Sequence, residues 1–233
     1  GRYLFQTRGC TECHGTDGQG RAFINDGAFR VTGPQIAPGS RSAVAAYRID
    51  DWVRTIRQGV DPSGRALLVM PSEDYNRMSD ADLGALVAYL KTMPAVEGLE
   101  RVVALPLPVR VLYGFGVIQD AAAKIDHRLP PQATVPMAAD ANYGRYVANM
   151  CIGCHGEHLS GGKIPGAPPD WPAAANLTPG DGSVMPRYVR LDAFSSMLKT
   201  GKRPDGSAIA VMPFESLSRL DDTEVAALHT FLA

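Results

Sequence analysis

The chain has 233 residues, of which 45% are hydrophobic, so it can bury a core as one large domain or as two small ones. Lys and Arg together number 23 against 24 Asp and Glu, and this balance argues against a nucleic-acid partner and against general disorder. The sequence contains no apolar run of the ~18 residues that a membrane-spanning helix needs, and no signal peptide is visible. Because Gly1 begins abruptly inside an expected helix, we expect that a leader or an anchor has been removed.

The first expected helix delivers the motif "CTECHG" (residues 10–15), and an equivalent helix delivers "CIGCHG" (residues 151–156). All four cysteines of the chain lie in these two motifs: Cys10, Cys13, Cys151 and Cys154. Three kinds of site use such cysteines, namely a thiol redox pair, a zinc site and a covalently attached haem. Residues three and four positions apart share a helix face, so the thiols and the following histidine of each motif point the same way. Haem attachment uses all six residues, with His14 and His155 as proximal iron ligands, and we predict two haem c groups.

A long repeat follows the two motifs. The segment 47–71, "YRIDDWVRTIRQGVDPSGRALLVMP", is similar to 188–213, "YVRLDAFSSMLKTGKRPDGSAIAVMP", and the two align without a gap from Ile49 onward at an offset of 142 positions. Each copy is expected to contain a loop with Met-Pro, a closing helix and, before them, a middle helix over about 50–58 and 192–200. The closing helices begin at residues typical of capping boxes, Ser79 with Asp82 and Asp221 with Glu224. The chain is therefore predicted to hold two copies of one helical domain.

Two equivalent methionines are the candidates for the second axial ligand of each iron. Met70 lies 56 positions after His14, and Met212 lies 57 positions after His155. Each precedes a proline in a loop between two expected helices, whereas a core methionine would recur at helical spacing. A thioether is soft and neutral, so it favours the reduced iron. We predict ligation by Met70 and Met212; the alternative is that both only fill gaps in the core.

Other residues flank the middle helix in both copies. Arg48 and Arg190 are predicted to pair with haem propionates, since a guanidinium matches a carboxylate well. A solvated arginine at a helix end explains them equally well. Tyr47, Tyr188 and Trp52 are predicted to line the haem walls, although ordinary core packing also accounts for aromatic residues at these places.

Residues 95–139 have no counterpart in the repeat. Prolines bracket a short expected helix near 109–125, and a loop this long is uncommon in a compact protein unless it packs. Because the segment is rich in Val and Leu and includes Tyr113 and Phe115, we expect it to lie across both domains. The predicted organisation is a first domain at 1–94, a linker at 95–139 and a second domain at 140–233.

The motifs "CTECHG" and "CIGCHG", each combined with a later "VMP", resemble class I cytochrome c domains in tandem. The stretches "ANLTPGDG", "GKRPDG" and "LDDTEVAALHTFL" are similar to parts of two-haem bacterial cytochromes c related to the cytochrome subunits of membrane-bound alcohol and gluconate dehydrogenases. This resemblance implies an all-α fold made of two class I cytochrome c domains. It also implies a periplasmic location, because haem of this type is attached outside the bacterial cytoplasm.

The expected function is electron transfer by two c-type haems with His/Met ligation, between a periplasmic or membrane dehydrogenase or reductase and a downstream acceptor of the respiratory chain. The expected partners are redox proteins, with membrane association only through a missing anchor or a partner subunit, and we expect no catalysis by side chains. The alternative is a two-haem peroxidase-type enzyme, in which one iron keeps an open or displaceable position. Both copies retain Met-Pro, which argues against that alternative.

Overall fold

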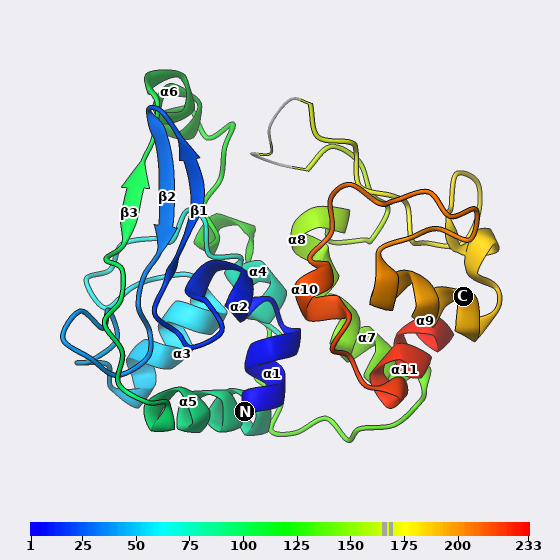
Figure 1. The fold of residues 1–233 in the computed structure, drawn as a ribbon, viewed down its shortest axis with the longest axis horizontal. Helices are drawn as coiled ribbons and strands as arrows, with labels where there is room; N and C mark the ends of the chain where they lie inside the picture. Colours follow the sequence, from blue (N-terminus) through cyan, green and yellow to red (C-terminus); the bar gives the residue numbers. More distant parts are fainter. Residues whose placement is uncertain (165–166, 168–169) are drawn as a thin grey trace.

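The computed structural model describes residues 1–164, 167 and 170–233 and divides them into two halves that lie side by side (Figure 1). We call residues 1–94 the first half and residues 140–233 the second half. Helices of the first half are α1 (Arg2–Thr7), α2 (Cys10–His14), α3 (Ile49–Gln58), α4 (Ser72–Tyr75) and α5 (Asp80–Thr92). Those of the second half are α7 (Ala141–Ala148), η2 (Asn149–Cys151), α8 (Ile152–His155), η3 (Met185–Tyr188), α9 (Leu191–Thr200), α10 (Phe214–Leu217) and α11 (Asp222–Leu232).

The sequence repeat corresponds to a repeat of backbone structure. Helices α3 and α4 have the same bounds as α9 and α10 when 142 is added to each residue number. Gly59 and Gly201 end the middle helices with φ of 67° and 70°, the left-handed conformation that glycine adopts without a steric cost. Each of their carbonyls then accepts from an amide in the following loop, Leu67 at 2.7 Å and Ile209 at 2.8 Å. The middle helices are therefore confirmed as equivalent elements.

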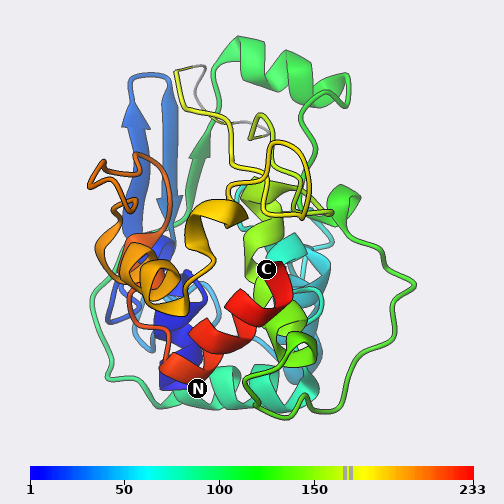
Figure 2. The ribbon, with the colours of Figure 1, turned by 90° about the vertical axis from the view of Figure 1, so that its right-hand side faces the viewer.

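Each half has its own hydrophobic core beneath its closing helix. The apolar stripe of α5 is buried at Leu83, Leu86, Val87 and Leu90, and the matching stripe of α11 is buried at Val225, Leu228 and Leu232. These stripes pack against the first helix of the same half, α1 or α7. Figure 2 shows α11 running across α7. Each buried Leu contributes roughly 1.5–3 kcal/mol, so these contacts hold in place the helix that precedes each Cys-x-x-Cys-His motif.

The all-α prediction is wrong. Within the described residues the first half carries a three-stranded antiparallel sheet in the order β1 (Arg21–Asp26), β2 (Phe29–Gly33) and β3 (Val102–Ala104). Asp26 pairs with Phe29, so the hairpin turns at Gly27 and Ala28, and Gly27 has φ 53°, a conformation that glycine adopts readily in a two-residue turn. In the second half, the bridge between Gly162 and Ala174 occupies the position equivalent to the base of this hairpin.

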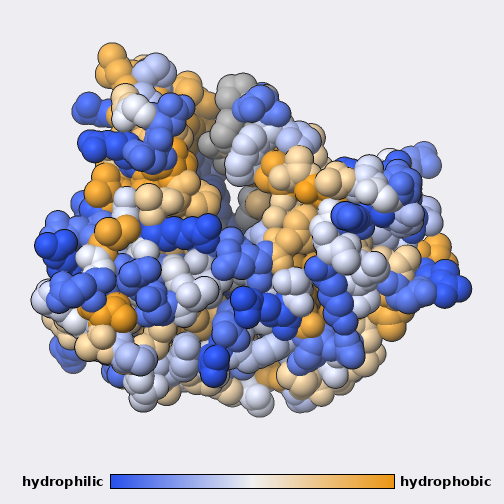
Figure 3. Space-filling view, in the orientation of Figure 1, coloured by the Kyte–Doolittle hydropathy of each residue, from blue (hydrophilic) through white to orange (hydrophobic). Residues whose placement is uncertain are grey.

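The linker packs in part. It supplies β3, and residues around η1 (Ala122–Lys124) are held by the first half, where Ala121 and Ile125 are buried. In contrast, α6 (Leu107–Gly114) stands at the end of the sheet, and Leu107 is 69% exposed and the adjoining Phe115 82% exposed. Figure 3 shows apolar residues gathered at that end. The expectation that the whole linker lies packed across both halves is therefore wrong for α6.

The two halves dock through contacts that run in both directions. Helix α4 of the first half packs against η2 and α8, and its equivalent α10 packs against α1 and α2. The hydroxyl of Tyr3 donates to Glu224 at 2.6 Å and accepts from the amide of Asp221 at 2.9 Å. The hydroxyl of Tyr146 donates to Asp82 at 2.5 Å and accepts from the amide of Ser79 at 3.0 Å. Each half therefore completes the N-terminal cap of the closing helix in the other half.

A buried ion pair lies at the centre of this interface. The guanidinium of Arg8 bonds the carboxylate of Glu224, and their side chains are 6% and 1% exposed. Tyr143 also donates to this carboxylate at 3.0 Å. Burial opposes ionisation of Glu224, but the hydrogen bonds and the charge of Arg8 outweigh it and hold its pKa below the ordinary value.

Among the described residues, no helix combines the length and apolar character needed to cross a membrane.

Candidate haem-binding sites

The two motif histidines have the same second-sphere hydrogen bond. Nδ1 of His14 lies 2.8 Å from the carbonyl oxygen of Pro34, and Nδ1 of His155 lies 2.8 Å from that of Ala175. A carbonyl can only accept, so Nδ1 carries the proton and Nε2 keeps its lone pair for a metal. Burial lowers the pKa of both imidazoles. Each histidine is therefore held as the neutral ligand that an iron requires.

A glycine at the end of each motif turns the chain back toward its histidine. Gly15 and Gly156 have φ of 74° and 79°, which a residue with a side chain rarely adopts. The carbonyl of His14 then accepts from the amide of Gly20 at 2.8 Å, and that of His155 accepts from Gly161 at 2.9 Å. The loop after each motif thus fixes its histidine from both sides.

All four motif cysteines are free thiols. Burial raises the pKa of Cys10 and Cys151 to about 12 and that of Cys13 to about 11, and it also raises the pKa of Cys154. Redox thiols and zinc ligands act as thiolates, which this environment disfavours. Among the described residues, no group of three or more Cys, His, Asp or Glu is arranged to hold a metal ion. The raised thiol pKa values disfavour both the redox pair and the zinc site, and the second observation disfavours the zinc site alone.

Met70 and Met212 differ from the core methionines. They are half-buried, and each packs beside the core of its own half, as do Cys10 and Cys151. Their carbonyls accept from Ser72 and Phe214, both at 2.9 Å, so their loops have the same shape. Four other methionines are buried at 6–7% exposure within the two cores: Met78, Met93, Met185 and Met197. Met70 and Met212 therefore occupy equivalent positions at the edge of each core, where their side chains are only partly buried.

Trp52 gives a test of whether haem fits the first half. Its side chain is 4% exposed and packs edge-on against Tyr47 at 5.3 Å. Its indole Nε1 is buried and has no hydrogen-bond partner among the described residues. A buried donor without an acceptor costs about 1–3 kcal/mol, and a haem carboxylate would remove that cost. In the second half, Tyr188 packs against Phe194 at 6.2 Å in the same edge-on way.

The two predicted arginines lie on the surface. Arg48 is the residue before α3, Arg190 is the residue before α9, and both are exposed. Arg190 bonds the carboxylate of Asp192 at 2.6 Å. The structure brings both arginines to the start of a middle helix, and their pairing with propionates stays a prediction.

Sequence reasoning missed the residues that join each motif to the opposite half. The amide of Gly153, in the second motif, donates to Oδ1 of Asp74 at 2.7 Å. At the equivalent place, Ser216 donates to Oε1 of Glu12, in the first motif, at 3.1 Å. The signal in the sequence was a pair of differences between the repeats, Glu12 against Gly153 and Asp74 against Ser216. The structure shows that the residues of each pair contact one another across the interface.

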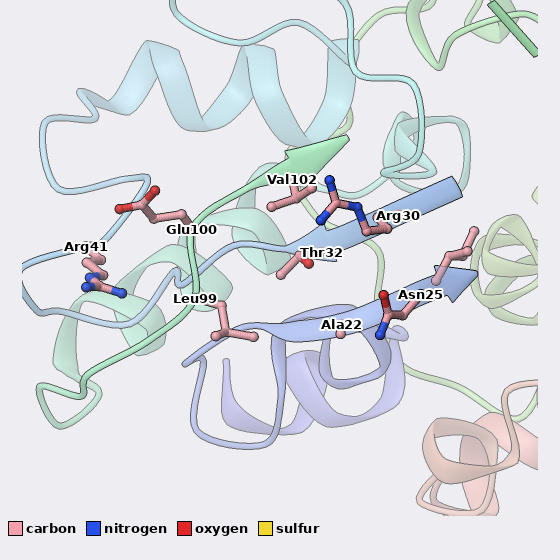
Figure 4. A pocket seen from close by; sticks show the side chains of 9 residues that line it. Ala22, Asn25, Arg30, Thr32, Arg41, Leu99, Glu100 and Val102 are labelled. Atoms are coloured by element: carbon pink, nitrogen blue, oxygen red, sulfur yellow. The ribbon is translucent and has the colours of Figure 1, made fainter. Parts of the chain in front are cut away.

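A cavity of about 560 Å³ lies over the sheet rather than at the motifs (Figure 4). Ala22, Arg30 and Thr32 line it from β1 and β2, together with Leu99 and Glu100 from the linker. The residues that line it include none of the predicted haem residues. The candidate sites therefore rest on the paired motifs and not on this cavity.

Comparison with known proteins agrees with the paired motifs. The sequence model of the family Cytochrome c matches residues 1–94, and that of Cytochrome C oxidase, cbb3-type, subunit III matches residues 138–232. The fructose dehydrogenase cytochrome subunit of Gluconobacter japonicus is 28% identical over 256 residues, covering 100% of this chain and 51% of the relative. The gluconate 2-dehydrogenase cytochrome c subunit of Pantoea cypripedii is 25% identical over 262 residues, covering 100% of this chain and 58% of the relative.

The chain spans little more than half the length of these two relatives. The resemblance predicted from the motifs is confirmed, because both relatives are cytochrome subunits of dehydrogenases and both motifs fall inside cytochrome matches. The matches imply haem c as the cofactor and support electron transfer as its role. Each half of the chain therefore matches a cytochrome family, and the chain over its whole length is related to the cytochrome subunits of dehydrogenases.

Proposed function

We propose that the chain is a two-haem electron-transfer subunit with the domain organisation 1–94, 95–139 and 140–233. Each haem would be attached through the cysteines of one motif, with His14 and Met70 as the iron ligands in the first domain and His155 and Met212 in the second. The bound haem supplies reversible one-electron chemistry at iron. The observation that carries the proposal is the pair of equal His–carbonyl bonds in two halves that also share equal methionine loops.

The protein side chains have three tasks in this scheme. The carbonyls of Pro34 and Ala175 orient the imidazoles and increase their basicity. The sulfurs of Met70 and Met212 would hold the iron in competition with small-molecule ligands, as soft neutral groups that favour its reduced state. The buried aromatic residues, with Trp52 foremost, keep water from the haem edge and offer a hydrogen bond to its carboxylate.

We further propose that a dehydrogenase donates electrons to the chain and that it works in the periplasm, soluble or tethered to the inner membrane. The names of both relatives support a dehydrogenase partner. Membranes that contain a dehydrogenase and are supplied with fructose or gluconate should reduce the haems of the added protein. Absence of reduction by any such membrane preparation, in a protein that dithionite does reduce, would contradict this partner.

Methionine ligation is tested by Met70→Ala and Met212→Ala in the haem-loaded protein. Each change should let one haem bind carbon monoxide and should lower the midpoint potential of that haem, because the thioether no longer stabilises the reduced iron. Absorption spectra with and without carbon monoxide and a redox titration measure both effects. The matched controls Met78→Leu and Met185→Leu alter buried core methionines and should leave both spectra unchanged. If neither alanine variant changes its spectrum, the ligation proposal is wrong.

A further inference from the structure

A carboxylate of the first half lies against the second haem-attachment motif. Asp74, on α4, accepts the amide hydrogen of Gly153 at 2.7 Å. A Cβ added to Gly153 would lie 3.0 Å from both carboxylate oxygens, which is closer than ordinary contact. The carboxylate is therefore seated directly on the backbone between the two cysteines of "CIGCH".

The equivalent place in the first motif has the opposite arrangement. Asp74 corresponds to Ser216, and Gly153 corresponds to Glu12. The hydroxyl of Ser216 donates to the carboxylate of Glu12 at 3.1 Å. Each motif thus has one carboxylate at this contact. In the first motif the carboxylate is part of the motif, and in the second motif the other half supplies it.

The surroundings of Asp74 make its charge effective over a short distance. Among the described residues Asp74 forms no ion pair. The nearby Lys124 bonds the carboxylate of the neighbouring Glu73 instead, at 2.8 Å. A small interface cavity of about 20 Å³ borders it. Burial raises the pKa of Asp74, and the hydrogen bond from Gly153 acts in the opposite direction. The titratable or charged groups that face it are Glu73, Lys124, Arg8, Tyr75, Tyr146 and the thiols of Cys151 and Cys154.

We propose that Asp74 is a positioning residue for the second haem, and that its carboxylate lowers the midpoint potential of that haem from the other half of the chain. The inference rests on the proposed two-haem function. The hydrogen bond fixes the backbone between Cys151 and Cys154, the two attachment points. The oxidised iron carries one more positive charge than the reduced iron, so a nearby carboxylate in a poorly solvated interface stabilises the oxidised state. Docking of the halves thereby sets the potential of the second site.

The test is Asp74→Asn in the haem-loaded full chain, because the amide can still accept from Gly153 while the charge is lost. Burial raises the pKa of Asp74 well above its ordinary value, so the redox titration is run at alkaline pH, where the carboxylate is ionised. It should show that the midpoint of the second haem rises and that the first midpoint stays in place. A variant with Cys151→Ala and Cys154→Ala retains the first haem alone and assigns the two midpoints. Glu12→Gln should raise the first midpoint, and Asp222→Asn, whose side chain is 93% exposed, should move neither.

Titration with pH gives a second readout. In the unchanged protein, the second midpoint should fall as pH rises through the ionisation of Asp74, and this step should be absent in Asp74→Asn. Asp74→Ser, which introduces the residue found at position 216, should also remove it and serves if the asparagine variant folds poorly. Faster hydrogen exchange at the Gly153 amide in Asp74→Ala would report the positioning role.

The proposal is overturned if Asp74→Asn and Asp74→Ser both move the second midpoint no more than Asp222→Asn does. It is also overturned if they move both midpoints equally. Failure of the proposed function is a separate result. It would appear in the unchanged protein, as a mass without two covalent haems or as a titration without two one-electron steps.

Discussion

Trp52 packs its ring against Tyr47 and so buries an indole N–H that finds no acceptor among the described residues. The second half has Phe194 at the equivalent position, which carries no such donor. A buried N–H without an acceptor destabilises the folded protein, so it calls for an explanation other than packing. A haem carboxylate that accepts from Trp52 Nε1 would provide one. The two haem sites are therefore expected to differ in how they hold a propionate.

The substitution Trp52→Phe should lower the midpoint potential of the first haem. Loss of a hydrogen bond of about 1 kcal/mol leaves more negative charge on the propionate, which corresponds to a fall on the order of 40 mV for one electron. Redox titration of the haem-loaded protein measures the change. Trp171→Phe removes the other tryptophan, which is 40% exposed, and should leave both midpoints in place. An unchanged first midpoint in Trp52→Phe would exclude this contact.

Local spacing made Cys10, Cys13 and His14 predictable, because their chemistry needs three residues on one turn of helix. Met70 could be predicted because its loop occurs twice in the sequence. Asp74 could not be predicted, since its partner Gly153 is 79 positions away and belongs to another half. Single residues whose role depends on docking leave no periodic signal in a sequence.

At the scale of elements, α5 and α11 begin with caps that are shared between the halves. The side chains of Ser79 and Asp221 accept from the amides of Asp82 and Glu224, as the capping-box pattern predicted. The carboxylates of Asp82 and Glu224, however, accept from tyrosine hydroxyls of the other half. In a capping box the side chain at the third helical position accepts from the backbone amide of the N-cap residue. Here a tyrosine hydroxyl of the other half accepts from that amide instead.

The substitutions Tyr146→Phe and Tyr3→Phe should each reduce the free energy of unfolding by about 1 kcal/mol, because each removes a cap and strands an amide. Denaturant unfolding of the haem-loaded protein measures the loss. Tyr89→Phe also removes a hydroxyl in the first half and serves as the control, with a smaller effect expected. A change near zero in both single variants would refute the shared caps.

The sheet was missed because no strand was predicted between the first motif and the middle helix. Gly27, at the first position of the two-residue turn between Asp26 and Phe29, was a readable hairpin signal. The partner strand β3, in contrast, comes from residues about 70 positions later, and no local pattern announces such a pairing. The helices were predictable because periodicity and caps are local.

At the scale of the whole molecule, one buried pair joins the halves. Removing the charge of Glu224 by Glu224→Gln leaves the guanidinium of Arg8 buried without a counter-ion. The expected loss in the free energy of unfolding is ~3–5 kcal/mol. Calorimetry should then show two separated transitions where the unchanged protein shows one. A single transition at the unchanged temperature would contradict a coupling role for this pair.

The same pair predicts a response to acid. The pKa of Glu224 is lower in the folded than in the unfolded chain, where an ordinary glutamate has a pKa of about 4.3. Its contribution is therefore fully present above that pH and is lost as the pH falls through the folded value. Unfolding measured from neutral to acid pH should show a smaller decline in Glu224→Gln than in the unchanged protein. Equal declines would assign the acid sensitivity to other groups.

The reciprocal tyrosines have an evolutionary consequence. A surface on which each unit offers the other the same contact is isologous, as in a homodimer with a two-fold axis. Helix α4 contacts η2 and α8 of the other half, and α10 contacts α1 and α2, which is the arrangement expected if a self-associating ancestor was duplicated and its subunits were then tethered. Once the two copies were part of one chain, their sequences could diverge at equivalent positions. Arg8 and Asp74 now stand where the sister unit has Asn149 and Ser216, so an ancestral symmetry has become a directional difference in charge.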